Sequence, residues 1–187
     1  MAITTLDTAS ALIVVDLQKG IVAMPVAHPV EAIVQRAGAL ADAFRRHGLP
    51  VVLVNVAGGA PGRAEQSRVR GELPADWAEL VPELHRQPGD HLVTKRTWGA
   101  FSHTDLEAWL RSRAVTQVVL AGVSTSVGVE STARHAYELG FNVTLATDAM
   151  TDMSIDSHNH SLTRIFPRLG ETGSSAQIID LLDRRRA

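Results

Sequence analysis

The sequence predicts an α/β protein in which a doubly wound, mostly parallel sheet of about six strands lies between two layers of helices. Three observations support this prediction. Short apolar runs rich in β-branched residues alternate along the chain with longer segments of helical periodicity. The runs are apolar at nearly every position, which is typical of parallel strands covered on both faces. Repeated strand–helix–strand order with right-handed crossovers then places helices on both sides of one sheet.

Five segments are predicted to be strands because they combine aliphatic and β-branched residues and lack charged ones. In chain order they are Ala11–Val15, Val51–Val56, His91–Thr94, Gln117–Ala121 and Asn142–Ala146. Between the second and the third lies the one long irregular region, residues 57–90, which is rich in Gly, Pro and Arg. Loops of this length in compact domains are more often lids or interface segments than linkers.

Four segments are predicted to be helices: Pro29–His47, Ser102–Arg113, Glu130–Leu139 and a last helix that begins at Ser174 or Ser175 and runs to the basic tail. The first carries an apolar stripe with helical spacing. The second opens with a serine and, three residues later, an aspartate, which is a capping-box pattern. Gly140 supplies a stop for the third helix, and Gln177 completes a cap for the last one.

The composition favours one domain, residues 1–187, with enough chain to bury a sizeable core. The formal net charge of -2 gives no electrostatic reason to expect binding to nucleic acid or to an anionic membrane. Cysteine is absent from the sequence, which excludes disulfides, thiolate zinc sites and a cysteine nucleophile. Met1–Ser10 lacks the features of a signal peptide, and no apolar run is long enough to span a bilayer. We therefore expect a cytoplasmic protein.

Three of the predicted strands end at residues or turns that can carry chemistry. Asp16 follows the first strand, Lys95 follows the third, and the turn Gly122–Gly128 follows the fourth. In an open α/β sheet, ligands bind at the carboxyl ends of the strands. We therefore expect an acid, a base and a helix N-terminus with free backbone N–H groups to converge on one cleft.

Each of these features also has a purely structural interpretation. A buried carboxylate has a raised pKa and suits proton transfer, but Asp16 can equally cap a helix or accept structural hydrogen bonds. Lys95 can extend to the rim of the sheet, and the turn can join strand to helix without binding anything. A lysine at the end of a buried strand is costly unless it is paired, and Asp16 is the obvious partner.

The segment VVLAGVSTSVGVESTARHAYELGFNVTLATDAM resembles the signature of the isochorismatase-like hydrolases, in which a cysteine usually stands where Gly128 does. The resemblance extends to VVDLQKG around Asp16 and KRTWGAF around Lys95. Downstream it includes the Asp148-Ala149 pair, His158 and IFPRLGE. It covers nearly the whole chain, with residues 57–90 matched poorly, and it implies the isochorismatase-like version of the predicted fold.

The resemblance implies an Asp, Lys and Cys triad, in which Asp16 and Lys95 match two places and Gly128 supplies no nucleophile. It also implies a cis peptide bond, which by position lies between Val123 and Ser124. Trp98 follows Lys95 closely enough to form a wall of the pocket. We expect the substrate to be bound by the residues that flank this centre, namely Gln18, Trp98, Phe101, Val123, Ser124, Thr125 and Val127.

Glycine at this place makes the chain similar to the isochorismatases proper, which release pyruvate from a vinyl ether without a covalent step. On that model Asp16 protonates the enol-ether carbon, Lys95 orients Asp16 and binds a carboxylate, and Gly128 leaves room for water or the pyruvyl group. A catalytically inactive, ligand-binding protein is one alternative. Another is hydrolysis of a small amide or ester by activated water or by a hydroxyl of Ser124, Thr125, Ser126 or Ser131.

We predict a small-molecule substrate and no cofactor or metal. His158 and His160 are two residues apart, a spacing that does not share a helix face, and Val56–Gly59 offers no ligands. The resemblance also implies association into a homodimer or homotetramer. Residues 57–90 and the IFPRLGE segment are the candidate interface material.

Overall fold

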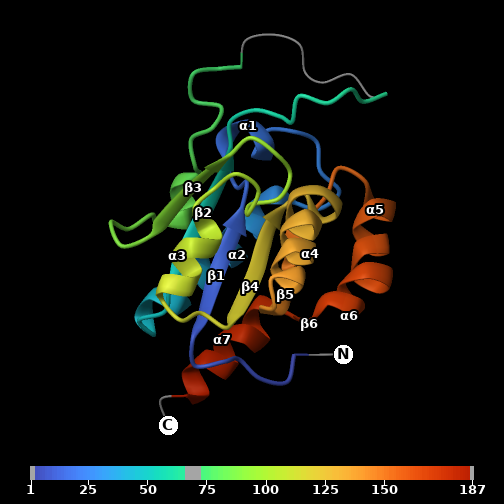
Figure 1. The fold of residues 1–187 in the computed structure, drawn as a ribbon. Coiled ribbons are helices and arrows are strands. Elements are labelled where there is room, and N and C mark those ends of the chain that lie inside the picture. Colours follow the sequence, from blue (N-terminus) through green and yellow to red (C-terminus); the bar gives the residue numbers. More distant parts are fainter. Residues whose placement is uncertain (1–2, 66–72, 186–187) are drawn as a thin grey trace.

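The computed structural model describes residues 3–65 and 73–185, and these form one sheet between two layers of helices (Figure 1). Six strands lie in the order β3-β2-β1-β4-β5-β6, and every neighbouring pair is parallel. The predicted fold class is therefore confirmed. The strands are β1 Ser10–Val15, β2 Val51–Val56, β3 His91–Lys95, β4 Gln117–Val123, β5 Asn142–Thr151 and β6 Glu171–Gly173.

The helices are α1 Lys19–Val22, α2 Val30–Arg46, α3 Leu106–Ser112, α4 Glu130–Glu138, α5 Ile155–His160, α6 Phe166–Leu169 and α7 Ser175–Arg184. Two π-helical turns, Thr125–Val129 and Ser161–Ile165, run directly into α4 and α6. A short 3₁₀ turn spans Pro82–Leu84. Within residues 3–65 and 73–185, no helix combines the length and the apolar character that a bilayer span requires.

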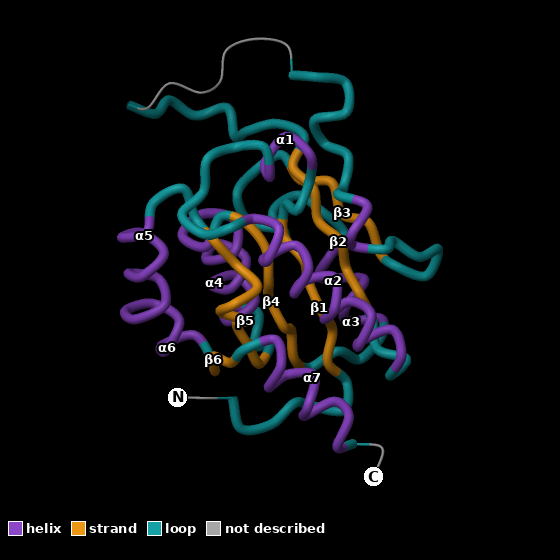
Figure 2. The backbone as a smooth tube through the Cα atoms, turned by 180° about the vertical axis from the view of Figure 1, so that it is seen from behind, coloured by secondary structure: helices purple, strands orange, loops and turns teal. Residues whose placement is uncertain are grey.

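Two hydrophobic cores form on opposite faces of the sheet. Leu12 and Val14 of β1 pack on the side covered by α2 and α7, which lie in front of the sheet in Figure 2. Ile13 and Val15 pack on the other side, against residues of α3, α4 and α6. All six residues of β1 are buried, because a central parallel strand is covered on both faces. The near-continuous apolar pattern of β1 thus has a direct structural cause.

Several element boundaries differ from the sequence prediction. The α3 helix begins at Leu106 and not at Ser102, and its N-cap Asp105 makes no side-chain capping bond. The expected capping box is wrong, because the Thr104 hydroxyl accepts from the Leu106 N–H at 3.4 Å. The last helix does carry the predicted box, formed by Ser174 and Gln177. Strand β6 has only three residues, too few to give a pattern in the sequence.

Part of the long region 57–90 packs over the end of β1 and is held there by backbone hydrogen bonds. Its stretch 73–81, which we call the strap, makes an antiparallel bridge between Leu80 and Gln18. The Lys19 N–H donates to the Glu79 carbonyl at 2.8 Å, and the Gly20 N–H donates to the Trp77 carbonyl at 3.0 Å. The strap therefore lies against the segment that follows Asp16.

Candidate active site

Asp16 directly follows β1 and lies at the carboxyl edge of the sheet. Its backbone takes a positive φ of 52°, and its N–H donates to the Val54 carbonyl at 2.9 Å. The carboxylate is buried, and its Oδ2 atom lies 2.6 Å from the Lys95 Nζ atom. Lys95 ends β3, two strands away, so its side chain reaches past the end of β2 to make this pair. The predicted ion pair is confirmed.

The environment of Asp16 favours its protonated form. Burial raises the pKa of the carboxyl group from 3.8 to about 6, although the charge and the hydrogen bond of Lys95 act in the opposite direction. Lys95 also donates to the Thr97 carbonyl at 3.3 Å. The second carboxylate oxygen, Oδ1, is buried and has no hydrogen-bond partner within the described part of the chain. Within the described residues, Lys95 therefore fixes one oxygen of Asp16, and the other oxygen is buried without a hydrogen-bond donor.

Gly128 brings the π-helical turn Thr125–Val129 against this carboxylate. A Cβ atom at Gly128 would lie 3.2 Å from Asp16 Oδ2, 3.1 Å from Val15 Cγ1 and 3.5 Å from the Val123 carbonyl oxygen. The Gly128 carbonyl in turn accepts from the Thr132 hydroxyl at 2.7 Å. The structure thus places Asp16, Lys95 and Gly128 together, as the sequence predicts.

The turn itself begins at a cis peptide bond between Val123 and Ser124, which confirms that expectation. The Ser124 carbonyl accepts from the N–H groups of both Val127 and Val129 at 3.1 Å. Ser124 and Val127 are partly exposed, whereas the Val123 side chain is buried in the core on the α2 side.

The side chains of three other predicted substrate-binding residues make contacts within the protein. The Gln18 amide bonds to the N–H and carbonyl of Val56 at 2.7 and 3.1 Å and to the Trp77 carbonyl at 3.0 Å. Phe101 is buried beside Phe141, and the Thr125 hydroxyl is buried against His158. Each can meet a substrate only through its backbone unless these contacts change, so their binding roles stay predictions.

The remaining predicted substrate-binding residue, Trp98, lies on the surface. Trp98 is 67% exposed, so a substrate-binding wall at this position stays a prediction. Among the described residues, no group of three or more His, Cys, Asp and Glu side chains is arranged to hold a metal ion.

Two residues outside the predicted set of site residues support the turn, and the sequence analysis did not single out the first of them. Asp152, just after β5, accepts through Oδ2 from the N–H and the hydroxyl of Ser126 at 2.7 and 2.8 Å. His158 in α5 is buried, with its Nδ1 atom 2.8 Å from the Thr125 hydroxyl and its ring centroid 4.7 Å from that of His28. Asp152 carries the same signal as Asp16, a carboxylate directly after a buried strand, but β5 runs five residues beyond its predicted end.

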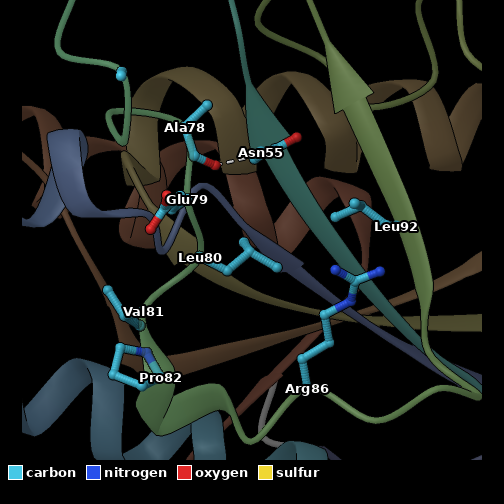
Figure 3. A pocket seen from close by; sticks show the side chains of 9 residues that line it. Asn55, Ala78, Glu79, Leu80, Val81, Pro82, Arg86 and Leu92 are labelled. Carbon is cyan, nitrogen blue, oxygen red and sulfur yellow. Dashed lines mark hydrogen bonds between the residues drawn. The ribbon is translucent and has the colours of Figure 1, made fainter.

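A separate cavity of about 470 Å³ lies under the strap, on the side of β2 and β3 that faces α2 (Figure 3). The Asn55 amide, which donates to the Ala78 carbonyl at 2.8 Å, lines it together with Arg86 and Leu92. None of the residues that line it is Asp16, Lys95 or a residue of the Thr125–Val129 turn. This cavity is therefore distinct from the candidate active site.

Known proteins resemble the chain over almost its full length. The isochorismatase domain model matches residues 10–177. The uncharacterized isochorismatase family protein YwoC of Bacillus subtilis (strain 168) is 44% identical over 178 residues, which are 91% of this chain and 93% of that protein. An isochorismatase family protein from Burkholderia thailandensis has a solved structure with a TM-score of 0.93 and 39% identity, covering 97% of this chain and 100% of that one.

A solved cysteine hydrolase from Pseudomonas syringae pv. phaseolicola 1448A also shares the fold. It has a TM-score of 0.80 and 26% identity, with 94% of this chain and 93% of that chain covered. The domain model and the relatives each match about nine-tenths of the sequence. This agreement establishes the family independently of the site geometry. The chain therefore belongs to the isochorismatase family and is a hydrolase.

Proposed function

We propose that this protein hydrolyses a small carboxylate substrate of the vinyl-ether type, such as isochorismate, by acid catalysis without a covalent intermediate. One observation carries the proposal: a buried carboxyl group with a pKa of about 6 and one unpartnered oxygen lies against a residue without a side chain. An acid with this pKa keeps a useful protonated fraction near neutral pH and is still strong enough to donate.

In the proposed reaction, Asp16 donates its proton to the terminal carbon of the enol ether. The resulting oxocarbenium ion accepts a water molecule, and the water's excess proton returns to Asp16. Collapse of the hemiketal breaks the carbon–oxygen bond and releases pyruvate and the hydroxylated ring. Lys95 stabilises the Asp16 carboxylate while the cation exists, because its ammonium group stays 2.6 Å away.

Gly128 has two roles in this proposal. It stands at the place of the cysteine nucleophile of related hydrolases, and a chain without any cysteine cannot form a thioester. It also keeps the space beside Asp16 Oδ2 free of side-chain atoms, since even a methyl group would approach that oxygen to 3.2 Å. In this proposal the absence of a side chain at Gly128 leaves the Asp16 carboxyl group uncrowded on this side.

The test compares isochorismate with a panel of small amides as substrates for the wild type, Asp16→Asn and Gly128→Cys. We expect pyruvate release by the wild type and a loss of about 10²–10⁴-fold in Asp16→Asn, the usual contribution of a general acid. Gly128→Cys should also lose pyruvate release, because its side chain crowds the carboxyl group. The matched control is Asp156→Asn, an exposed carboxylate in α5 that should leave activity unchanged.

The proposal fails if the wild type acts on neither class of substrate while Gly128→Cys acts on amides. That outcome would identify the fold as a thiol-hydrolase scaffold without its nucleophile.

A further inference from the structure

Asp152 is a buried carboxylate whose closest hydrogen bonds go to the turn that carries Gly128. Its Oδ2 atom accepts from the Ser126 N–H at 2.7 Å and from the Ser126 hydroxyl at 2.8 Å. Its Oδ1 atom accepts a longer bond from the Ser154 N–H at 3.3 Å, and its carbonyl accepts from the Ala27 N–H at 2.8 Å. A buried carboxylate needs such partners, and here the strongest ones belong to the turn.

The bonds to Ser126 fix the second residue of a five-residue turn that other hydrogen bonds hold near its start and its end. At the start, the Ser124 carbonyl accepts from the N–H groups of Val127 and Val129. At the end, the Thr132 hydroxyl donates to the Gly128 carbonyl, and the Ala100 N–H donates to that hydroxyl at 3.0 Å. Among these contacts, the bonds to Ser126 are the ones made by Asp152, the residue that directly follows β5.

A second contact from the same direction holds the neighbouring residue. The Thr125 hydroxyl lies 2.8 Å from His158 Nδ1, and both side chains are buried. Burial and the nearby His28 lower the pKa of His158, so this contact is made by a neutral ring near pH 7. Two consecutive residues of the turn are therefore attached to the β5–α5 region through their side chains.

The position of this turn matters for Asp16 because the two are in close contact. Gly128 lies so near that a Cβ atom would be 3.2 Å from Asp16 Oδ2. A displacement of the turn by about 1 Å would open a gap beside a carboxyl group whose pKa is raised by burial. We infer that Asp152 is a positioning residue of the active site, which holds the Thr125–Val129 turn through Ser126 and thereby keeps Gly128 against Asp16.

The inference rests on the proposed function, since it takes Asp16 as the reacting acid, but its test needs no substrate. The measurement is the pKa of Asp16, obtained by ¹³C NMR titration of its carboxyl carbon, with the resonance identified by its absence in Asp16→Asn. We expect Asp152→Ala to lower this pKa from about 6 by one unit or more, because the turn withdraws and water reaches the carboxyl group.

Asp152→Asn is the matched control, since its amide oxygen can keep both bonds to Ser126 while the charge is removed. We expect its Asp16 pKa to stay near the wild-type value. An equal fall in Asp152→Asn and Asp152→Ala would mean that the charge of Asp152 acts directly on Asp16, and would overturn the inference. An unchanged pKa in folded Asp152→Ala would overturn it as well.

Ser126→Ala decides the question if Asp152→Ala does not fold. It removes the hydroxyl bond and leaves the N–H bond, so we expect a smaller fall in the Asp16 pKa, and no fall would contradict the inference. With an active substrate, Asp152→Ala should lower kcat more than it raises KM, and Asp152→Asn should restore kcat. The NMR titration does not depend on the substrate. If isochorismate is not hydrolysed, the proposed function is wrong, but the NMR result still tests the role of Asp152.

Discussion

At the scale of single residues, the chemistry of the site depends on how Asp16 is surrounded. Burial raises its pKa, and Lys95 partly cancels that effect. The sequence was sufficient to predict both residues, because each directly follows a buried strand of detectable pattern. It was not sufficient for Asp152, since β5 runs to Thr151 through a register shift against β4 that no local pattern signals. Nor could it show that the Gln18 amide is satisfied by the backbone, which depends on contacts between distant segments.

The pH dependence of kcat/KM should report the protonation of Asp16. If Asp16 is the general acid, only its protonated form reacts, so kcat/KM should be highest below pH 6 and fall about tenfold per unit above it. A pH–rate profile of the wild type on its substrate measures this directly. A rise in kcat/KM through pH 6 would show instead that Asp16 acts as a base.

Replacing Lys95 should shift that profile to higher pH. In Lys95→Met the burial of Asp16 is no longer opposed by a cation, so the pKa of Asp16 rises and the falling limb moves to higher pH. The maximal rate should drop, because the conjugate carboxylate loses its stabilising partner. Lys19→Met, which removes an exposed lysine paired with Asp76 and Glu79, should leave the limb in place. A shift toward lower pH would contradict the assigned role of Lys95.

At the scale of elements, two irregular segments shape the site more than the regular helices do. The Thr125–Val129 turn is π-helical and follows a cis peptide bond, and the strap 73–81 is fixed by backbone bonds to the segment after β1. The cis bond was expected from the family signature alone. The strap could not be predicted, because its pairing joins residues about sixty positions apart and its own sequence shows no strand pattern.

Gly20→Ala should loosen the strap. A Cβ atom at Gly20 would lie 2.0 Å from the Trp77 Cδ1 atom, so the indole ring must move. Alanine favours a helix over glycine by about 1 kcal/mol, yet overpacking costs about 1–3 kcal/mol, so we expect a net loss of stability in urea unfolding. Gly59→Ala, in open space, is the control. In a Trp77→Ala background Gly20→Ala should cost less than it does in the wild type, and an equal cost in both would exclude the steric explanation.

At the scale of the whole molecule, the site lies where the order of the strands reverses. The chain moves outward from β1 through β2 to β3 and then from β4 through β5 to β6, so β1 and β4 are neighbours whose following loops diverge. Asp16 follows β1, and the Gly128 turn follows β4. Open α/β sheets bind ligands at this point, which is why the sequence alone could predict where these residues meet.

Gly122→Ala should disrupt the fold at this reversal point. Gly122 has a φ of 120°, and a Cβ atom there would lie 2.0 Å from the Val15 carbonyl oxygen, a backbone atom that cannot turn aside. We expect loss of cooperative thermal unfolding or of soluble expression. Gly140→Ala also has a positive φ, of 81°, but meets open space, so it should cost only about 1–2 kcal/mol. Similar melting temperatures for the two variants would contradict this account.

The space beside Asp16 also bears on how such enzymes diverge. Gly128 lies outside the left-handed backbone region, and the nearest obstacles to a side chain are a valine methyl carbon at 3.1 Å and a carboxylate oxygen at 3.2 Å. The scaffold could therefore accommodate a small side chain by local movements of a few tenths of an ångström. Under the proposed function, a single amino-acid replacement at one fixed backbone position separates acid-catalysed from thiol-dependent hydrolysis. A descendant could then exchange one reaction class for the other without rebuilding the protein around it.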